Sequence, residues 1–363
     1  MLIYQVLIMN GKINVMKINI KKSNTLKYEY EMLKVGDADA ILIRHFIGDE
    51  AFVVLIDAGN ASASTTIKNH IKKYFGTTHI DLAICTHPDS DHKDGFFDLL
   101  ADDEITISEF WLTDPASYLD EDDIERYRNH DNAIVAVRKI WNKSTDDNLN
   151  LIELAIKKCG KNNVTNIIDG VEHQTLPIKC VGPSSKYYLE NVKRMVEDYN
   201  VVPYDDSSKE DYDEAFKIDD DEIKSVIDKE EDPSPYNASS LILLYEPGDG
   251  KRLLFAGDAN TTSLQMMLDK YPWLRNVTML KAPHHGSKRN LNTKIIDALA
   301  PAKTYVSAAG NKKHPSGRLL YWLAKHGDVF STHSANVYVH CSYGDIPERE
   351  GAKPLEPTKK CIK

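Results

Sequence analysis

Short apolar runs separated by polar turns make up most of the chain after residue 27. Two of these runs, AILIRHF (40–46) and FVVLIDAG (52–59), flank a five-residue stretch that contains glycine, which predicts a β-hairpin. The next segment, TIKNHIKKYF (66–75), has apolar residues on one helical face and lysines on the other, which predicts an amphipathic helix. The run IDLAICTH (80–87) then predicts a buried strand.

The rest of the chain mixes hairpins with strand–helix units. Residues 114–160 are expected to be helical up to Gly160, 176–183 to return to strand and 185–199 to form a helix. A further hairpin is expected to turn at residues 247–250, and strands and helices alternate after it. This mixture favours an α/β fold in which sheets pack together with helices outside them.

Charge is concentrated in one segment. The 363 residues carry a net charge of −10, and residues 201–236 hold 14 Asp or Glu against four Lys, so the remainder is nearly neutral. We therefore expect an acidic insertion at about 184–235. Its part from 201 to 232 should lie outside the catalytic core, where it is a candidate docking element for a protein partner. The expected organisation is an N-terminal extension (1–27), one domain (28–345) and a C-terminal tail (346–363).

Cysteine usage and hydropathy suggest a compartment. The five cysteines are scattered without a CxxC pair, which suits a reducing environment. The apolar start has no basic segment before it and no small-residue cleavage site, so we expect no signal peptide. No apolar stretch approaches the ~20 residues of a bilayer-spanning helix. The expectation is a cytoplasmic protein that is not embedded in a membrane.

Candidate metal ligands follow three predicted strands. They lie in THPDSDHKDGF (86–96), LLFAGDAN (253–260) and LKAPHHGSKRN (280–290). Each string alone has an ordinary explanation, such as a helix cap, a turn or a buried structural histidine. Three such strings at strand ends are better explained by one metal site. The expected ligands are His87, Asp89, Asp91, His92, Asp258 and His285.

In their order and their residues, these strings resemble the motifs of the metallo-β-lactamase superfamily, in particular those of the branch with the ComEC C-terminal domain and the phosphorylcholine esterases. The matching strings are VGDADAILI (35–43), VLIDAG (54–59), HPDSDHKDG (87–95), NASSLIL (237–243), LLFAGD (253–258), APHHGS (282–287) and NKKHPS (311–316). The resemblance covers roughly residues 28–341. It implies an α/β fold of the four-layer αβ/βα sandwich type.

The resemblance also implies metal roles. His87 and Asp89 fall at the first metal, Asp91 and His92 at the second, and Asp258 at the carboxylate that bridges both. The superfamily's last histidine ligand precedes a glycine, so that role falls to His285 rather than His284.

The first metal site departs from the superfamily. Asp89 and Asn237 stand where members with a complete first site have histidine, a change that the ComEC-like branch shares. An oxygen-rich site accepts Mn²⁺ more readily than an imidazole-rich one, so two divalent ions are expected, either Zn²⁺ or Mn²⁺. Candidates for supporting the ligands or contacting substrate are Asp39, Asn237, His284, Ser287 and Lys288.

The implied reaction is hydrolysis with a water activated by two metal ions. Catalytic roles are expected for Asp91, which would orient that water or take its proton, for His314, which would contact a phosphate oxygen or protonate the leaving group, and for Lys281. Basic residues near the motifs favour an anionic substrate; they are Lys281, Lys288, Arg289, Lys312, Lys313 and Arg318.

A phosphodiesterase or nuclease is therefore the leading hypothesis. A small phosphoester or phosphorylcholine-type esterase, another ester or lactone hydrolase, and a non-catalytic metal-binding module stay open. The sequence shows no helix-turn-helix, OB or zinc-finger pattern and no strongly basic domain, so nucleic acid is a candidate substrate only through the resemblance. Oligomeric state is not indicated.

Overall fold

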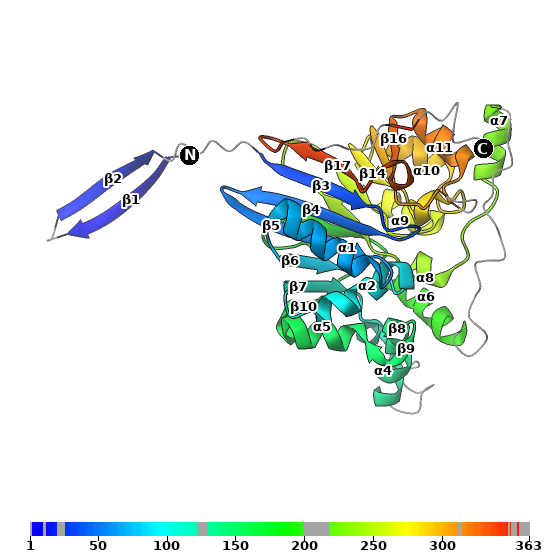
Figure 1. Cartoon of the computed structure of the whole chain (residues 1–363), viewed down its shortest axis with the longest axis horizontal. Coiled ribbons are helices and arrows are strands. Elements are labelled where there is room, and N and C mark those ends of the chain that lie inside the picture. Colours follow the sequence, from blue (N-terminus) through cyan, green and yellow to red (C-terminus); the bar gives the residue numbers. More distant parts are fainter. Residues whose placement is uncertain are drawn as a thin grey trace.

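The computed structural model describes residues 2–9, 12–19, 26–121, 130–198, 218–310, 314–347, 349 and 354–355. The N-terminal extension contains two strands, β1 (Leu2–Met9) and β2 (Lys12–Asn19), which pair antiparallel with each other. They belong to neither main sheet (Figure 1). Within these ranges no helix combines the length and apolar character needed to cross a bilayer.

The first main sheet has seven strands in the order β10-β7-β6-β5-β4-β3-β17. Its members are β3 (Tyr28–Leu33), β4 (Ala40–Ile47), β5 (Glu50–Ala58), β6 (His79–Ile84), β7 (Thr106–Leu112), β10 (Val164–Asn166) and β17 (Tyr338–Tyr343). The β4–β5 pair is the expected hairpin. Strands β5, β6, β7 and β10 run parallel, so their carboxyl ends share one edge.

The second main sheet has six strands in sequence order from β11 to β16. They are β11 (Ile178–Gly182), β12 (Ile242–Tyr245), β13 (Leu253–Phe255), β14 (Met279–Lys281), β15 (Lys303–Val306) and β16 (Asp328–Ser331). The hairpin expected at residues 247–250 joins β12 to β13. From β13 onwards the strands are parallel and share a carboxyl edge.

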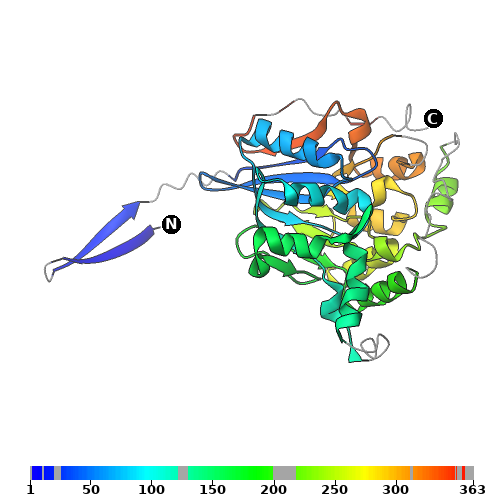
Figure 2. The same ribbon diagram turned by 60° about the horizontal axis from the view of Figure 1, so that its bottom comes forward.

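Helices cover the outer faces of both sheets. Blue, cyan and green helices lie over the first sheet in Figure 2, and the helices after residue 260 lie over the second. The helices are α1 (Ala63–His70), η1 (Ile71–Phe75), α2 (Ser90–Ala101), η2 (Pro115–Tyr118), α4 (His130–Arg138), η3 (Lys139–Trp141), α5 (Leu151–Cys159), η4 (Lys161–Asn163), α6 (Ser185–Asp198), α7 (Asp220–Ile227), α8 (Pro235–Ala238), α9 (Thr261–Lys270), η6 (His284–Gly286), α10 (Thr293–Leu299), α11 (Gly317–Ala324) and η7 (Thr332–Ser334).

Three hydrophobic cores define four layers. Because successive side chains of a strand point to opposite faces, Leu42 packs under α1, α2 and α5, whereas Ile43 packs between the sheets. In the second sheet Leu243 belongs to the same core between the sheets as Ile43. Leu244 points to the opposite face, where it packs against α9, α10 and α11. The expected αβ/βα sandwich is confirmed.

The segment expected to be helical from residue 114 to 160 is interrupted. A short hairpin, β8 (Asn142–Lys143) and β9 (Asp146–Asn150), separates η3 from α5, and residues 122–129 lie outside the described ranges. The intervening Ser, Thr, Asp and Asn side chains compete for backbone hydrogen bonds and favour turns over helix. Gly160 does follow the end of α5, as expected.

The acidic segment is the main correction to the expected organisation. The prediction that residues 201–232 lie outside the catalytic core is wrong for the part from 218 to 232, while 199–217 lie outside the described ranges. Ile223 and Ile227, one helical turn apart on α7, are buried in the same hydrophobic core as residues of α9, α10 and α11, and α7 packs against α11. Asp232 is buried as well. The strong negative charge of the segment drew attention away from these two apolar positions in the sequence.

Candidate metal centre

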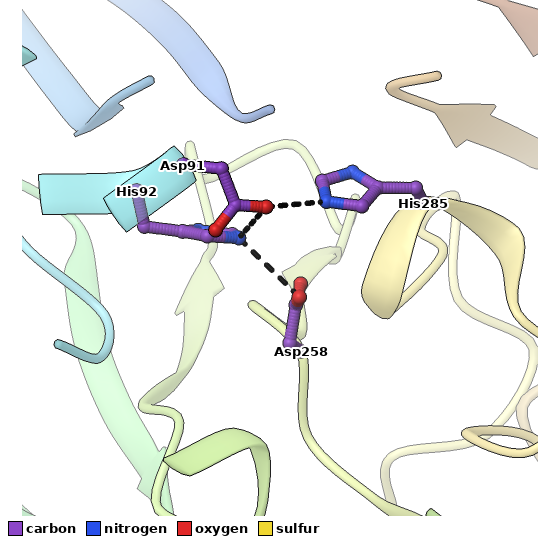
Figure 3. A group of neighbouring side chains, drawn as sticks. All are labelled: Asp91, His92, Asp258 and His285. Carbon is purple, nitrogen blue, oxygen red and sulfur yellow. Dashed lines mark hydrogen bonds and ion pairs between the residues drawn. The ribbon is translucent and has the colours of Figure 1, made fainter. Parts of the chain in front are cut away.

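The candidate ligands come together where strands of both sheets end. Asp57 ends β5, His87 follows β6, Asp258 follows β13 and His285 follows β14. Asp89 is the residue before α2, and Asp91 and His92 lie in its first turn. Parallel strands deliver their following loops to one edge, which explains why distant segments meet (Figure 3).

The four residues expected at the second metal form a compact group. Ligand atoms of Asp91, His92, Asp258 and His285 all lie within 4.8 Å of one another. His285 Nε2 is 3.0 Å from an Asp91 oxygen, and His92 Nε2 is 3.3 Å from Asp258 Oδ2 (Figure 3). The side chain of Asp91 is 32% exposed, whereas the other three are nearly inaccessible. Asp91 therefore lies on the open side of the group.

The residues expected at the first metal lie beside this group. His87 Nε2 is 3.7 Å from Asp89 Oδ2 and 4.0 Å from Asp258 Oδ2, so Asp258 is shared between the two sets. Asp89 is 34% exposed and, like Asp91, faces the open side. Asn237 is buried, and its amide oxygen has no hydrogen-bond partner among the described residues.

Hydrogen bonds assign the tautomers of the three ligand histidines. His92 Nδ1 donates to Asp57 (2.8 Å), and His285 Nδ1 donates to the Ser307 carbonyl (2.9 Å). His87 Nδ1 contacts the Thr86 hydroxyl (3.1 Å), which is itself committed as a donor to Asp57 and so accepts.

With each Nδ1 engaged in this way, Nε2 is the ring nitrogen that faces the carboxylates. For His87 and His92 this atom is buried and has no hydrogen-bond partner among the described residues. Imidazole nitrogens held in this way beside carboxylates fit a divalent metal ion.

Neighbouring charges keep the ligand carboxyl groups ionised. Burial alone would raise the pKa of Asp258, but His92 and Lys281 hold it well below its ordinary value. Burial would likewise raise the pKa of Asp91, and His92 and His285 lower it instead. Ionised carboxylates are the form that binds a metal ion.

Lys281, for which a catalytic role was expected, does not face the open side. Its side chain is inaccessible, forms an ion pair with Asp39, donates to the Gly257 carbonyl (2.9 Å) and lies 3.5 Å from Asp258. Burial alone would lower the pKa of Lys281, but Asp39 and Asp258 raise it. The Asp39–Lys281 pair therefore supports the bridging carboxylate from behind.

Asp57 is a supporting residue that sequence reasoning missed. It accepts hydrogen bonds from the Thr86 amide, the Thr86 hydroxyl and His92. Its position at the strand end of VLIDAG was the available signal. Gly95 permits this contact, because a Cβ there would lie 1.9 Å from the Ala58 carbonyl oxygen. Helix α2 thus approaches β5 closely enough for His92 to reach Asp57.

His284 and His285 point to different partners because the backbone turns between them. Both have left-handed φ angles, 45° and 53°, which non-glycine residues adopt only under constraint. The His284 ring contacts Asp232 (3.0 Å) and Asn290 (3.1 Å) rather than the ligand group. Asp232 also accepts from Asn237 (2.7 Å). Neither Asp232 nor Asn290 was singled out from the sequence.

The remaining candidate residues differ in burial and in their partners. The His314 ring is buried, 5.1 Å from the His284 ring and 5.8 Å from the His285 ring. Ser287 is buried and Lys288 half-buried. Arg289 is buried, Arg318 lies 3.8 Å from Glu222, and Lys312 and Lys313 fall outside the described ranges. Most of the basic residues expected near substrate are therefore buried, lie close to an acidic side chain or fall outside the described ranges.

A second acidic group lies on the first sheet, away from these strand ends. Glu29, Glu31 and His340 have ligand atoms within 4.8 Å of one another. Arg349 pairs with both glutamates, and Arg44 pairs with Glu29. The arginines neutralise the carboxylates, so this group is a buried ion network.

Comparisons with known proteins give partial matches. No family model matches the chain. Over 97 residues the chain is 33% identical to ComE operon protein 3 of Bacillus subtilis (strain 168), a match that covers 26% of this chain and 12% of that protein. It fits the resemblance to the ComEC branch, although the matched part is a small fraction of that protein.

Two solved structures are similar to the chain. A mutant of CmlA beta-hydroxylase is 14% identical with a TM-score of 0.43, over 88% of this chain and 54% of that one. The metallo-beta-lactamase fold protein YhfI from Bacillus subtilis is 10% identical with a TM-score of 0.42, over 87% of this chain and 99% of that one.

Proposed function

We propose that this protein is a metal-dependent hydrolase that cleaves phosphodiesters, with nucleic acids among the candidate substrates. The observation that carries the proposal is the convergence of three imidazole Nε2 atoms on two carboxylates, with each Nδ1 already engaged elsewhere. Such an arrangement needs positive charge, because buried carboxylates close to one another are costly unless a cation neutralises them, and a divalent metal ion held by the imidazoles supplies that charge.

Two divalent ions in such a site supply Lewis-acid activation of water and neutralise the charge that develops on a phosphoryl group. The chain's own residues hold the ligands in place. Asp57 and Ser307 orient His92 and His285, and the Asp39–Lys281 pair supports Asp258. Asp91 is the partly exposed carboxylate at the mouth of the group, so its free oxygen is placed to accept a proton from water.

The ligand chemistry supports a phosphodiester over a lactam or lactone. Asp89 and the buried amide oxygen of Asn237 make the first site rich in oxygen, and oxygen ligands suit Mn²⁺ as well as Zn²⁺. The resemblance to the ComEC and phosphorylcholine esterase branch points to the same substrate class. Two dications facing three ligand carboxylates would leave excess positive charge at the open side, which favours an anion.

The test combines metal analysis with a substrate panel. Purified protein is loaded with Zn²⁺ or Mn²⁺, its metal content is measured by mass spectrometry, and turnover is measured with bis-p-nitrophenyl phosphate, single-stranded DNA and RNA. A nuclease should show KM values that rise steeply with salt, because each neutralised phosphate releases counterions, whereas a small diester should show a shallow dependence. Metal-loaded protein that hydrolyses lactones or esters and none of these phosphodiesters would contradict the proposal.

A further inference from the structure

Residues 219–232, which we call the acidic strap, are tied to the helices that cover the second sheet. Asp220 pairs with Lys325, just beyond α11, and Asp228 accepts from the Thr293 amide and hydroxyl (both 2.8 Å) at the start of α10. Glu231 accepts from the Thr262 amide at the start of α9. Carboxylates at helix N-termini satisfy free amides and interact favourably with the helix dipole. The strap therefore has a defined course across three helices.

The last residue of the strap enters the candidate metal centre. Asp232 is 1% exposed, and its amide donates to the Arg289 carbonyl (2.9 Å) beside the histidine pair. Its Oδ2 accepts from Asn237 (2.7 Å), His284 Nδ1 (3.0 Å) and Asn290 (3.0 Å), and its Oδ1 accepts from the Ser234 amide (3.0 Å). Burying an ionised carboxylate is expensive unless it is so completely hydrogen-bonded.

Asp232 orients the His284 ring together with Asn290, because His284 Nδ1 lies 3.0 Å from Asp232 Oδ2 and 3.1 Å from Asn290 Oδ1. The amide of His284 donates to Asp258 Oδ1 (3.1 Å), so its backbone is attached directly to the bridging carboxylate. Its side chain is 11% exposed and lies next to His285 and His314. With Nδ1–H donated to Asp232, the opposite ring edge carries Nε2. The ring thus lies beside the ligand group with a proton on Nδ1.

We propose that Asp232 is a positioning residue that holds the His284 imidazole at the centre so that its Nε2 edge contacts a phosphoryl oxygen of the substrate. This assignment rests on the proposed phosphodiesterase function and gives the acidic strap a direct part in it. A purely structural residue at this place could be apolar at lower cost, since a buried carboxylate with four hydrogen bonds stabilises little beyond its desolvation.

The variants Asp232→Ala and Asp232→Asn test the assignment, with Asp228→Ala as the matched control. Asp228 belongs to the same strap and loses the same charge, and its carboxylate accepts from Thr293 at the start of α10. Turnover of bis-p-nitrophenyl phosphate is measured at saturating Zn²⁺, with equal occupancy checked by mass spectrometry and folding checked by circular dichroism. Asp232→Ala should lower kcat by about 10- to 100-fold, the usual effect of removing a partner that orients a site residue, with little change in KM. Asp232→Asn retains an acceptor oxygen for His284 and should restore part of that loss.

The ring nitrogens of His284 provide a second measurement that does not depend on turnover. In the zinc-loaded full chain, the ¹⁵N signal of His284 Nδ1, assigned with a His284→Gln variant, should report a protonated nitrogen and shift in Asp232→Asn but not in Asp228→Ala. Equal kcat values for Asp232→Ala and Asp228→Ala, an effect on KM alone, or an unchanged Nδ1 signal in Asp232→Asn would each overturn the assignment. If the wild type cleaves no phosphodiester, the proposed function fails, and the Nδ1 signal still decides whether Asp232 orients the ring.

Discussion

The substitution Asp57→Asn isolates the contribution of a single supporting carboxylate to metal binding. Asp57 has a left-handed backbone (φ 56°), which asparagine adopts readily, so the change introduces no new strain. Three donors meet this carboxylate, each at 2.8 Å: the Thr86 amide, the Thr86 hydroxyl and His92 Nδ1. Asparagine offers one acceptor oxygen, so at least one donor must face an amide N–H.

The expected magnitudes follow from these bonds. One buried donor left without an acceptor costs about 1–3 kcal/mol, so the free energy of unfolding of the metal-free protein should fall by that amount. His92 also loses a charged partner that raises its basicity as a ligand. Removing such a partner weakens metal binding by about 10- to 100-fold. That range corresponds to about 1.4–2.8 kcal/mol of binding free energy.

Urea unfolding followed by circular dichroism measures the first quantity, and competition with a chromophoric zinc chelator measures the second. Asp81→Asn is the matched control, because Asp81 lies on the neighbouring strand β6 and accepts from the Val53 amide (2.7 Å) without touching a ligand histidine. It should leave zinc affinity unchanged. If Asp57→Asn binds Zn²⁺ as tightly as Asp81→Asn, the hydrogen bond from His92 does not tune the metal site and the reasoning is refuted.

Three further predictions concern the ligands, the packing and the ion network. Asp258→Ala should lose both ions because this carboxylate is shared, whereas His285→Ala should mainly empty the second site; mass spectrometry of the purified variants decides, and full occupancy in Asp258→Ala would contradict the assignment. Gly95→Ala should destabilise the protein by about 1–3 kcal/mol or more in urea unfolding, because the new Cβ would overlap the Ala58 carbonyl oxygen; wild-type stability would show that α2 can move away. Burial would raise the pKa of Glu29, but hydrogen bonds from neighbouring histidine and arginine side chains lower it to about 2, so its contribution to stability is present above its unfolded value of 4.5 and is lost as pH falls from there towards 2. Between pH 4.5 and about 2, the Glu29→Gln variant should therefore lose less stability than the wild type does. An identical pH dependence of the two proteins would show that ionisation of Glu29 does not contribute to the loss.

The sequence by itself determined the parts of this protein that depend on neighbouring residues. Apolar runs on either side of turn residues predicted the hairpins, and apolar residues on one helical face predicted the amphipathic helix at α1. The order of the motifs indicated the layers of the sandwich. Six residues could be proposed as candidate ligands because they follow strands, and parallel strands bring such loops to one edge; they are His87, Asp89, Asp91, His92, Asp258 and His285.

Only the tertiary structure decided which side chains support those ligands. Asp57 meets His92 across 35 residues, and Asp232 meets His284 across 52, distances over which no local pattern carries information. The same limit concealed the burial of Lys281, since a lysine at the end of a strand looks like surface until Asp39 and Asp258 are seen around it. Local patterns report how a segment folds, whereas sheet register and packing determine which segments touch. The candidate ligands could therefore be proposed from the sequence, and the residues that contact them could not.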